Sequence, residues 1–181
     1  RCPYGYPDLN GEAQLEICQT TCASFTRYVL EKEGDVAAVI AEPARAVPYI
    51  PPPGYWQMVR QACNDHGALL IFDEIPTGPG KTGKMFACEH DDVVPDILVL
   101  GKALGGGILP IAAVLAKSEL DVADEFAFGH YTHEKNPVTS KAALTTIEII
   151  EQEGLVENAE DLGKYMLEQL NMLKAKHSVI G

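Results

Sequence analysis

Residues 68–74, Ala68-Leu69-Leu70-Ile71-Phe72-Asp73-Glu74, form a short apolar run that ends in two carboxylates. Residues 97–102, Ile97-Leu98-Val99-Leu100-Gly101-Lys102, repeat this pattern with an amine at the end. A third run, residues 36–41, leads to Glu42. Short, continuous apolar runs of this kind are typical of strands that are buried on both faces of a sheet. The three runs therefore predict three central strands.

The segments around these strands show helical spacing of apolar residues. Helices are predicted over residues 12–33, 54–65, 137–152 and 156–176, and a fourth strand over 109–116. Asn136 and Pro137 form a good helix start, with a capping side chain and a proline at the first helical position. Helices that alternate with buried strands indicate an α/β fold, and we predict a three-layer, mainly parallel sheet with flanking helices.

The composition is that of an ordinary globular chain. Its 181 residues are 46% hydrophobic, and 14 Lys and Arg against 26 Asp and Glu give a formal charge of −12. An acidic chain argues against non-specific binding to nucleic acid or to anionic membranes. No apolar stretch reaches the ~20 residues that span a bilayer.

The five cysteines are irregularly spaced, and Cys18 and Cys22 fall on one predicted helix face. This usage favours reduced thiols in the cytoplasm over a disulfide framework or a metal site. The chain opens at Arg1 without Met or a visible targeting signal, and we expect it to be a piece of a longer protein.

Three polar residues, Glu42, Asp73 and Lys102, follow the ends of the three central strands. Parallel α/β sheets bind ligands at the carboxyl ends of their strands, so these residues are the first candidates for a site. A lysine at the end of a buried strand suits Schiff-base chemistry, because desolvation lowers its proton affinity. The alternatives are a cap or loop hydrogen bond for Asp73 and an exposed surface lysine for Lys102.

In this context the chain resembles the class III (omega-type) aminotransferases, which are pyridoxal-phosphate enzymes of fold type I. The resemblance extends over nearly all 181 residues. The matching stretches are Ala37-Ala38-Val39-Ile40-Ala41-Glu42-Pro43, Tyr49-Ile50-Pro51-Pro52-Pro53-Gly54, residues 69–74, residues 77–86, Pro95-Asp96 and residues 101–107. The resemblance implies an enzyme that moves an amino group from an amine or amino acid to a keto acid.

The resemblance also implies roles for individual residues. Lys102 matches the catalytic lysine that holds pyridoxal 5'-phosphate as a Schiff base, and Asp73 matches the carboxylate beside the ring nitrogen. Ile75 matches the aliphatic residue on the ring face, and Glu42 a glutamate beside the substrate pocket. Thr132 matches a threonine that contacts the cofactor phosphate across a dimer interface, which implies a homodimer.

Several positions depart from the usual family pattern. Pro76 stands where the family has a Gln that donates a hydrogen bond near the ring, and the segments 44–48 and 131–136 also differ. These departures resemble a subgroup that contains a phosphonate ammonia-lyase, so elimination of ammonia from an amino-phosphonate is the alternative reaction. The candidate cations for a phosphonate, against which an ordinary surface role stays open, are Arg45, His130, His133 and Lys135.

Other motifs give no competing function. The segment 78–84 lacks the spacing of a phosphate-binding loop, since Met85 follows Lys84 where Ser or Thr is required. The run 88–92 is contiguous and predicts a solvated loop, so no metal site is expected. We expect residues 1–154 to form the central part of the cofactor-binding large domain, and residues 155–181 a helix towards a small domain. A non-catalytic α/β fragment remains the contrasting hypothesis.

Overall fold

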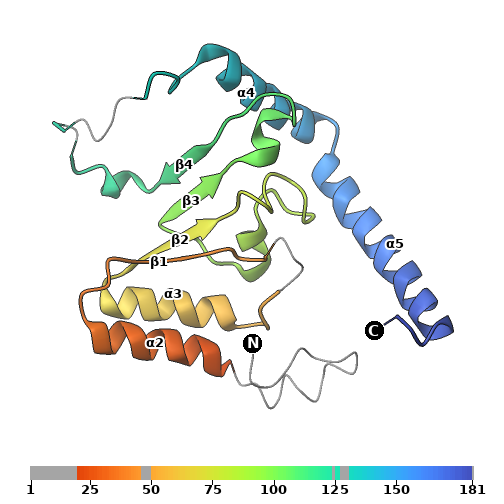
Figure 1. Ribbon diagram of the computed structural model, residues 1–181, viewed down its shortest axis with the longest axis horizontal. Coiled ribbons are helices and arrows are strands. Elements are labelled where there is room, and N and C mark those ends of the chain that lie inside the picture. Colours follow the sequence, from red (N-terminus) through yellow and green to blue (C-terminus); the bar gives the residue numbers. More distant parts are fainter. Residues whose placement is uncertain (1–19, 46–49, 124, 127–130, 181) are drawn as a thin grey trace.

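The computed structural model describes residues 20–45, 50–123, 125–126 and 131–180 (Figure 1). Its α-helices are α2 (Thr21–Glu33), α3 (Tyr55–His66), α4 (Pro137–Gln152) and α5 (Leu155–Lys176). Its strands are β1 (Ala38–Ala41), β2 (Leu69–Asp73), β3 (Ile97–Leu100) and β4 (Ala113–Ala116). Short 3₁₀ helices are η1 (Ala87–Asp91), η2 (Lys102–Gly105) and η3 (Ser118–Leu120).

The sheet has the strand order β1-β2-β3-β4. β1 pairs with β2, and β2 with β3, in parallel, whereas β3 and β4 are antiparallel. The link between β3 and β4 contains η2 but no α-helix of the length that a parallel crossover needs. The predicted α/β class is confirmed as a mixed sheet flanked by helices.

The predicted fourth strand is shorter than expected. β4 begins at Ala113, so residues 109–112 of the predicted strand 109–116 do not join the sheet. Pro110 lies in this segment, and a proline has no N–H to donate to a ladder. The pairing therefore starts only after the proline.

The core lies between the sheet and α3. Leu70 and Phe72 of β2 are fully buried, and the residues that alternate with them, Leu69, Ile71 and Asp73, are half-buried. The rings of Trp56 and Phe72 meet edge to face with centroids 4.8 Å apart, and the Trp56 indole N–H donates to the Pro43 carbonyl at 3.0 Å. β2 therefore turns one row of side chains towards the helices and the other row away from them.

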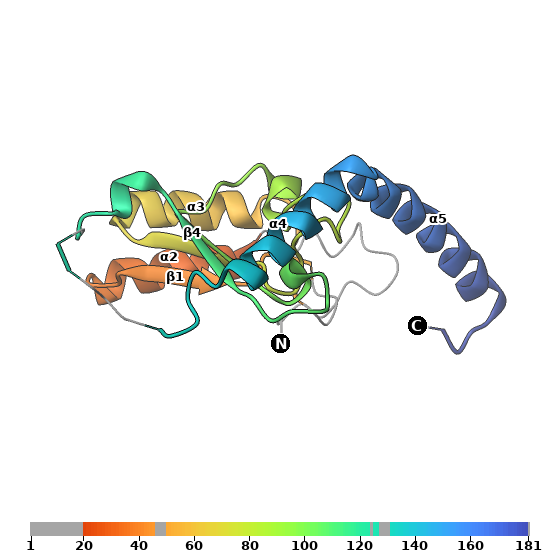
Figure 2. The same ribbon diagram turned by 90° about the horizontal axis from the view of Figure 1, so that it is seen from above.

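The two C-terminal helices begin as predicted but differ in their packing. Asn136 Oδ1 accepts the Val138 N–H at 2.9 Å, and Pro137 occupies the first helical turn of α4. α4 packs closely on η2, because a Cβ on Gly106 would lie 2.9 Å from Thr146 Oγ1. α5 has no buried residue and runs away from the sheet in both views (Figures 1 and 2).

Some predictions fall outside the described residues. These are the part of helix 12–33 that lies before residue 20, residues 46–48 of the departing segment 44–48, Cys18 and His130. Within the described part of the chain, no helix combines the length and the apolar character that crossing a membrane requires.

Candidate active site at the carboxyl edge of the sheet

The register of the central strands brings Asp73 and Lys102 to one edge of the sheet. Asp73 is the register partner of Val99, and the Glu74 N–H donates to the Val99 carbonyl at 2.9 Å. Lys102 opens η2 just beyond the end of β3, the strand that contains Val99. Because β2 and β3 are parallel, the carboxylate and the amine belong to neighbouring strands at the same carboxyl edge.

Asp73 is half-buried at the end of β2. Its Oδ1 accepts the Ile75 N–H at 3.0 Å, which is the one hydrogen bond that the described residues give to this carboxylate. A partly desolvated carboxylate is stabilised by further donors or by a cation, so the remaining acceptor capacity of Asp73 suits a ligand that carries a proton.

Lys102 has an unusual backbone conformation. Its side chain is exposed, and its φ of 43° lies in the left-handed region, which a residue with a Cβ adopts at a cost. Such strain concentrates at functional positions, where the surrounding structure holds it in place. The preceding Gly101 lies against Ile75, since a Cβ at position 101 would be 3.4 Å from the Ile75 Cγ atoms.

Glu42 joins the same edge, whereas Thr132 does not. Ala41 of β1 is the register partner of Phe72, so Glu42, half-buried, follows β1 at the edge where Asp73 ends β2. Thr132 is exposed in the turn before α4, and no hydrogen bond or ion pair between described residues joins it to the edge.

The positions that depart from the family pattern, where the structure describes them, are half-buried or exposed. The Pro76 carbonyl accepts a hydrogen bond from Lys81 Nζ at 2.9 Å, so this loop is held by a lysine amine at that point. Arg45, His133 and Lys135 are exposed. These side chains are therefore accessible, but the described contacts do not gather them around one point.

Two buried carboxylates escaped the sequence analysis. Glu74 is 0% exposed and accepts hydrogen bonds from Thr77 Oγ1 at 2.9 Å, Ala87 N at 2.6 Å and Cys88 N at 2.8 Å. Burial, followed by the nearby Glu74 charge, raises the pKa of Cys88 to about 12, so this thiol stays protonated at neutral pH. The signal for Glu74 was the alternation of β2, in which it continues the buried row of Leu70 and Phe72.

Asp96 is the second buried carboxylate, at the start of β3. It accepts hydrogen bonds from Leu70 N at 2.7 Å, Arg60 at 2.6 Å and Lys117 Nζ at 2.7 Å. Burial raises the pKa of Asp96, but these three donors outweigh burial and lower it to about 2. No sequence pattern predicted this cluster, because its members come from separate elements.

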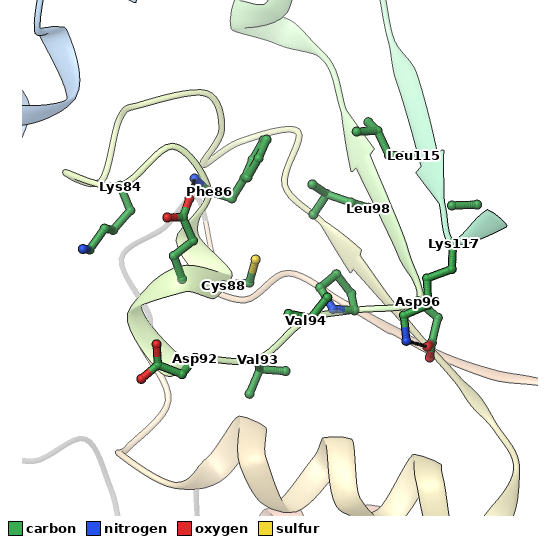
Figure 3. A pocket seen from close by; sticks show the side chains of 13 residues that line it. Lys84, Phe86, Cys88, Asp92, Val93, Val94, Asp96, Leu98, Leu115 and Lys117 are labelled. Carbon is green, nitrogen blue, oxygen red and sulfur yellow. Dashed lines mark hydrogen bonds and ion pairs between the residues drawn. The ribbon is translucent and has the colours of Figure 1, made fainter. Parts of the chain in front are cut away.

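The hollow drawn in Figure 3 lies away from the candidate residues. It is a cavity of about 600 Å³ between η1 and the strands β3 and β4. Asp96 and Lys117 stand at one end and Lys84 at the other, with Phe86 and Cys88 between them (Figure 3). Asp73, Ile75 and Lys102 do not line it. The candidate site in this chain is therefore a sheet edge and not this cavity.

No group of three or more His, Cys, Asp or Glu residues within the described ranges is arranged to hold a metal ion. The run 88–92 was predicted to be a solvated loop. In the structure most of it belongs to the 3₁₀ helix η1, and its first residue, Cys88, is buried.

The family model Aminotransferase class-III matches residues 1–181. The chain belongs to this family. Class-III aminotransferases are pyridoxal-phosphate enzymes. The chain is similar, with 42% identity over 173 residues, to the (R)-1-hydroxy-2-aminoethylphosphonate ammonia-lyase of Vibrio splendidus (strain 12B01). That match covers 95% of this chain and 36% of the relative.

Solved structures of aminotransferases share the fold. An aminotransferase from Bacillus anthracis matches with a TM-score of 0.81 and 34% identity, over 86% of this chain and 37% of the other. The ornithine aminotransferase of Toxoplasma gondii, described with partial occupancy of PLP at its active site, matches with a TM-score of 0.77 and 33% identity, over 86% and 36%. The chain thus spans little more than a third of the length of these relatives.

Proposed function

We propose that this chain is the central part of a pyridoxal-phosphate-dependent aminotransferase that moves an amino group from an amine or amino acid to a keto acid. The observation that carries the proposal is the common edge of Asp73 and Lys102 on neighbouring parallel strands. In this proposal, residues 1–154 belong to the cofactor-binding large domain, and residues 155–181 lead towards a small domain that the relatives' greater length has room for.

The residues at the edge fit this cofactor chemically. Lys102 offers an exposed amine for the cofactor aldehyde, and Asp73 offers free acceptor capacity for a protonated ring nitrogen. Ile75, held against Gly101, offers an apolar surface for a ring face. When bound, the cofactor supplies an electron sink for the carbanion that forms as the substrate loses a proton.

The chain's own residues then bind, orient and move protons. The Lys102 amine would hold the cofactor, and it would also accept the proton that the substrate Cα loses. The Asp73 carboxylate keeps the ring nitrogen protonated, because a nearby negative charge favours the charged form. Glu42 borders the substrate, and Thr132 contacts the phosphate in the site of a partner subunit of a homodimer.

We place the enzyme in the cytoplasm. The buried thiols of Cys63 and Cys88 form no disulfide with another described residue, as is usual in a reducing compartment.

A second candidate function is elimination of ammonia from an amino-phosphonate. It is favoured by the 42% identity to the ammonia-lyase, against 33% and 34% for the two aminotransferases described above. The replacement of the family's Gln by Pro76 also supports it, because proline removes a hydrogen-bond donor beside the ring.

The test uses the whole protein that contains this chain, purified with pyridoxal phosphate. Borohydride reduction followed by peptide mass spectrometry is expected to find a pyridoxyl group on Lys102. Alanine or glutamate formed from a keto acid supports transfer, and free ammonia without an acceptor supports elimination. A protein that carries no cofactor on Lys102, and gives neither product, contradicts both functions and leaves the non-catalytic fragment.

A further inference from the structure

Glu74 is a buried carboxylate, and none of the hydrogen bonds that the described residues donate to its side chain comes from a cationic group. Its side chain is 0% exposed, and its donors are one hydroxyl and two backbone amides, those of Thr77, Ala87 and Cys88. Oε2 accepts hydrogen bonds from the Thr77 hydroxyl and the Ala87 amide, and Oε1 accepts one from the Cys88 amide. A buried carboxylate is costly unless such donors satisfy it, so this set of bonds must be kept for the local structure to persist.

The same residue is also bonded through its backbone. The Glu74 N–H donates to the Val99 carbonyl at 2.9 Å, and the Glu74 carbonyl accepts Thr77 N at 3.2 Å and Gly78 N at 2.9 Å. Side chain and backbone together therefore tie the end of β2 to β3 and to both ends of the loop between residue 77 and η1.

Glu74 lies between two residues of the candidate site. Asp73 precedes it, Ile75 follows it, and the Ile75 N–H donates to Asp73 Oδ1 at 3.0 Å. Successive side chains of an extended strand point to opposite faces, and the burial pattern agrees: Glu74 shares the buried row of Phe72. Glu74 therefore faces away from the ligand that Asp73 is placed to contact.

We infer that Glu74 is a positioning residue for the cofactor site, which holds Asp73 and Ile75 in register with the Gly101-Lys102 end of β3. The inference rests on the function proposed above. It assigns Glu74 no contact with cofactor or substrate. Glu74 acts by fixing the orientation of Asp73. It therefore influences the affinity for the cofactor and the protonation of the ring nitrogen.

The informative variant is Glu74→Gln. The amide has one oxygen, so however it is turned, its NH₂ group faces the N–H of Ala87 or of Cys88. Thr77→Val is a milder second variant, which removes the hydroxyl donor and keeps the shape. Val59→Ala is the matched control, because Val59 is 1% exposed in α3 and contacts the core without being part of this network.

The experiment titrates pyridoxal phosphate into the cofactor-free whole protein and follows the visible absorbance of the bound cofactor against pH. Glu74→Gln is expected to weaken cofactor binding by about tenfold or more, as loss of an outer hydrogen-bond partner does at metal sites. The pH midpoint of the absorbance is expected to move, and the Ala87 and Cys88 amides to exchange hydrogen faster. Val59→Ala is expected to change only the thermal midpoint.

The outcomes separate the two hypotheses. If the wild-type protein binds cofactor but Glu74→Gln matches Val59→Ala in affinity and pH midpoint, the positioning role is wrong and the proposed function stands. If Glu74→Gln does not fold, Thr77→Val decides: weaker binding with a moved midpoint supports the role, and wild-type values overturn it. A wild-type protein that binds no cofactor overturns the proposed function, and this inference with it.

Discussion

Asp73 and Asp96 lie at opposite ends of the β2–β3 pair and receive different numbers of hydrogen bonds from the described residues. Asp96 is saturated by three donors from the protein, the Leu70 amide, Arg60 and Lys117. Asp73 receives one hydrogen bond from the described residues, that of the Ile75 amide. A carboxylate that is satisfied internally stabilises the fold, whereas one with spare acceptor capacity at a carboxyl edge is available to a ligand.

The largest effect is expected from removing the amine that shares the edge with Asp73, which tests whether this edge is the functional one. Lys102→Ala in the whole protein is expected to abolish turnover, because it removes the amine to which the proposed function assigns the anchoring of the cofactor. Stability is expected to stay within about 0.5 kcal/mol, because the side chain is exposed. Activity assays and urea denaturation measure both effects, and measurable turnover would contradict the assigned role.

Lys102→Gly serves as the paired variant. It is expected to be equally inactive but more stable than Lys102→Ala by about 1 kcal/mol, because glycine adopts a φ of 43° without strain. Equal stability of the two variants would show that the backbone at this position is not strained.

Asp73→Asn tests the functional carboxylate directly. The Asn side-chain oxygen still accepts the Ile75 N–H, so folding stability is expected to change by less than about 0.5 kcal/mol. The loss of charge is expected to slow turnover by roughly 10²–10⁴-fold, the usual size of a contribution to proton transfer. A near-normal kcat would remove Asp73 from the mechanism.

Asp96→Asn is expected to give the opposite result. It leaves Arg60, whose side chain is 16% exposed, without its counter-charge, which is expected to cost about 3 kcal/mol of folding stability. Folded protein is expected to keep its kcat. Asp65→Asn is the control, because it breaks the exposed ion pair with Arg27 at 2.6 Å. It is expected to lose far less folding stability than Asp96→Asn. Similar losses in both variants would contradict the contrast.

The sequence predicted the polar edge because that edge depends on local features. Apolar runs predicted β1, β2 and β3, and Glu42, Asp73 and Lys102 stand within two residues of the ends of these runs. The direction of β4 was not predicted, since it depends on the link that precedes the strand.

Asp96 and Glu74 were missed because their partners are remote in sequence. Arg60, Leu70 and Lys117 meet Asp96 only after α3, β2 and β4 have assembled, and no spacing rule connects them. Glu74 follows Asp73 directly, yet two of its donors come from the start of η1. Only the period of β2 pointed to its burial.

The last expected effect concerns pH. Asp96 has a folded-state pKa of about 2, below its ordinary value of 3.8, so ionised Asp96 stabilises the folded protein. That contribution is complete above pH 4 and is lost as the pH falls through about 2, since protonation then weakens the bonds to Arg60 and Lys117. The gap in pKa corresponds to roughly 2 kcal/mol. Denaturation of wild type and Asp96→Asn between pH 5 and pH 2 measures it: the stability difference between them is expected to shrink across this window, and a constant difference would mean that Asp96 does not carry this pH dependence.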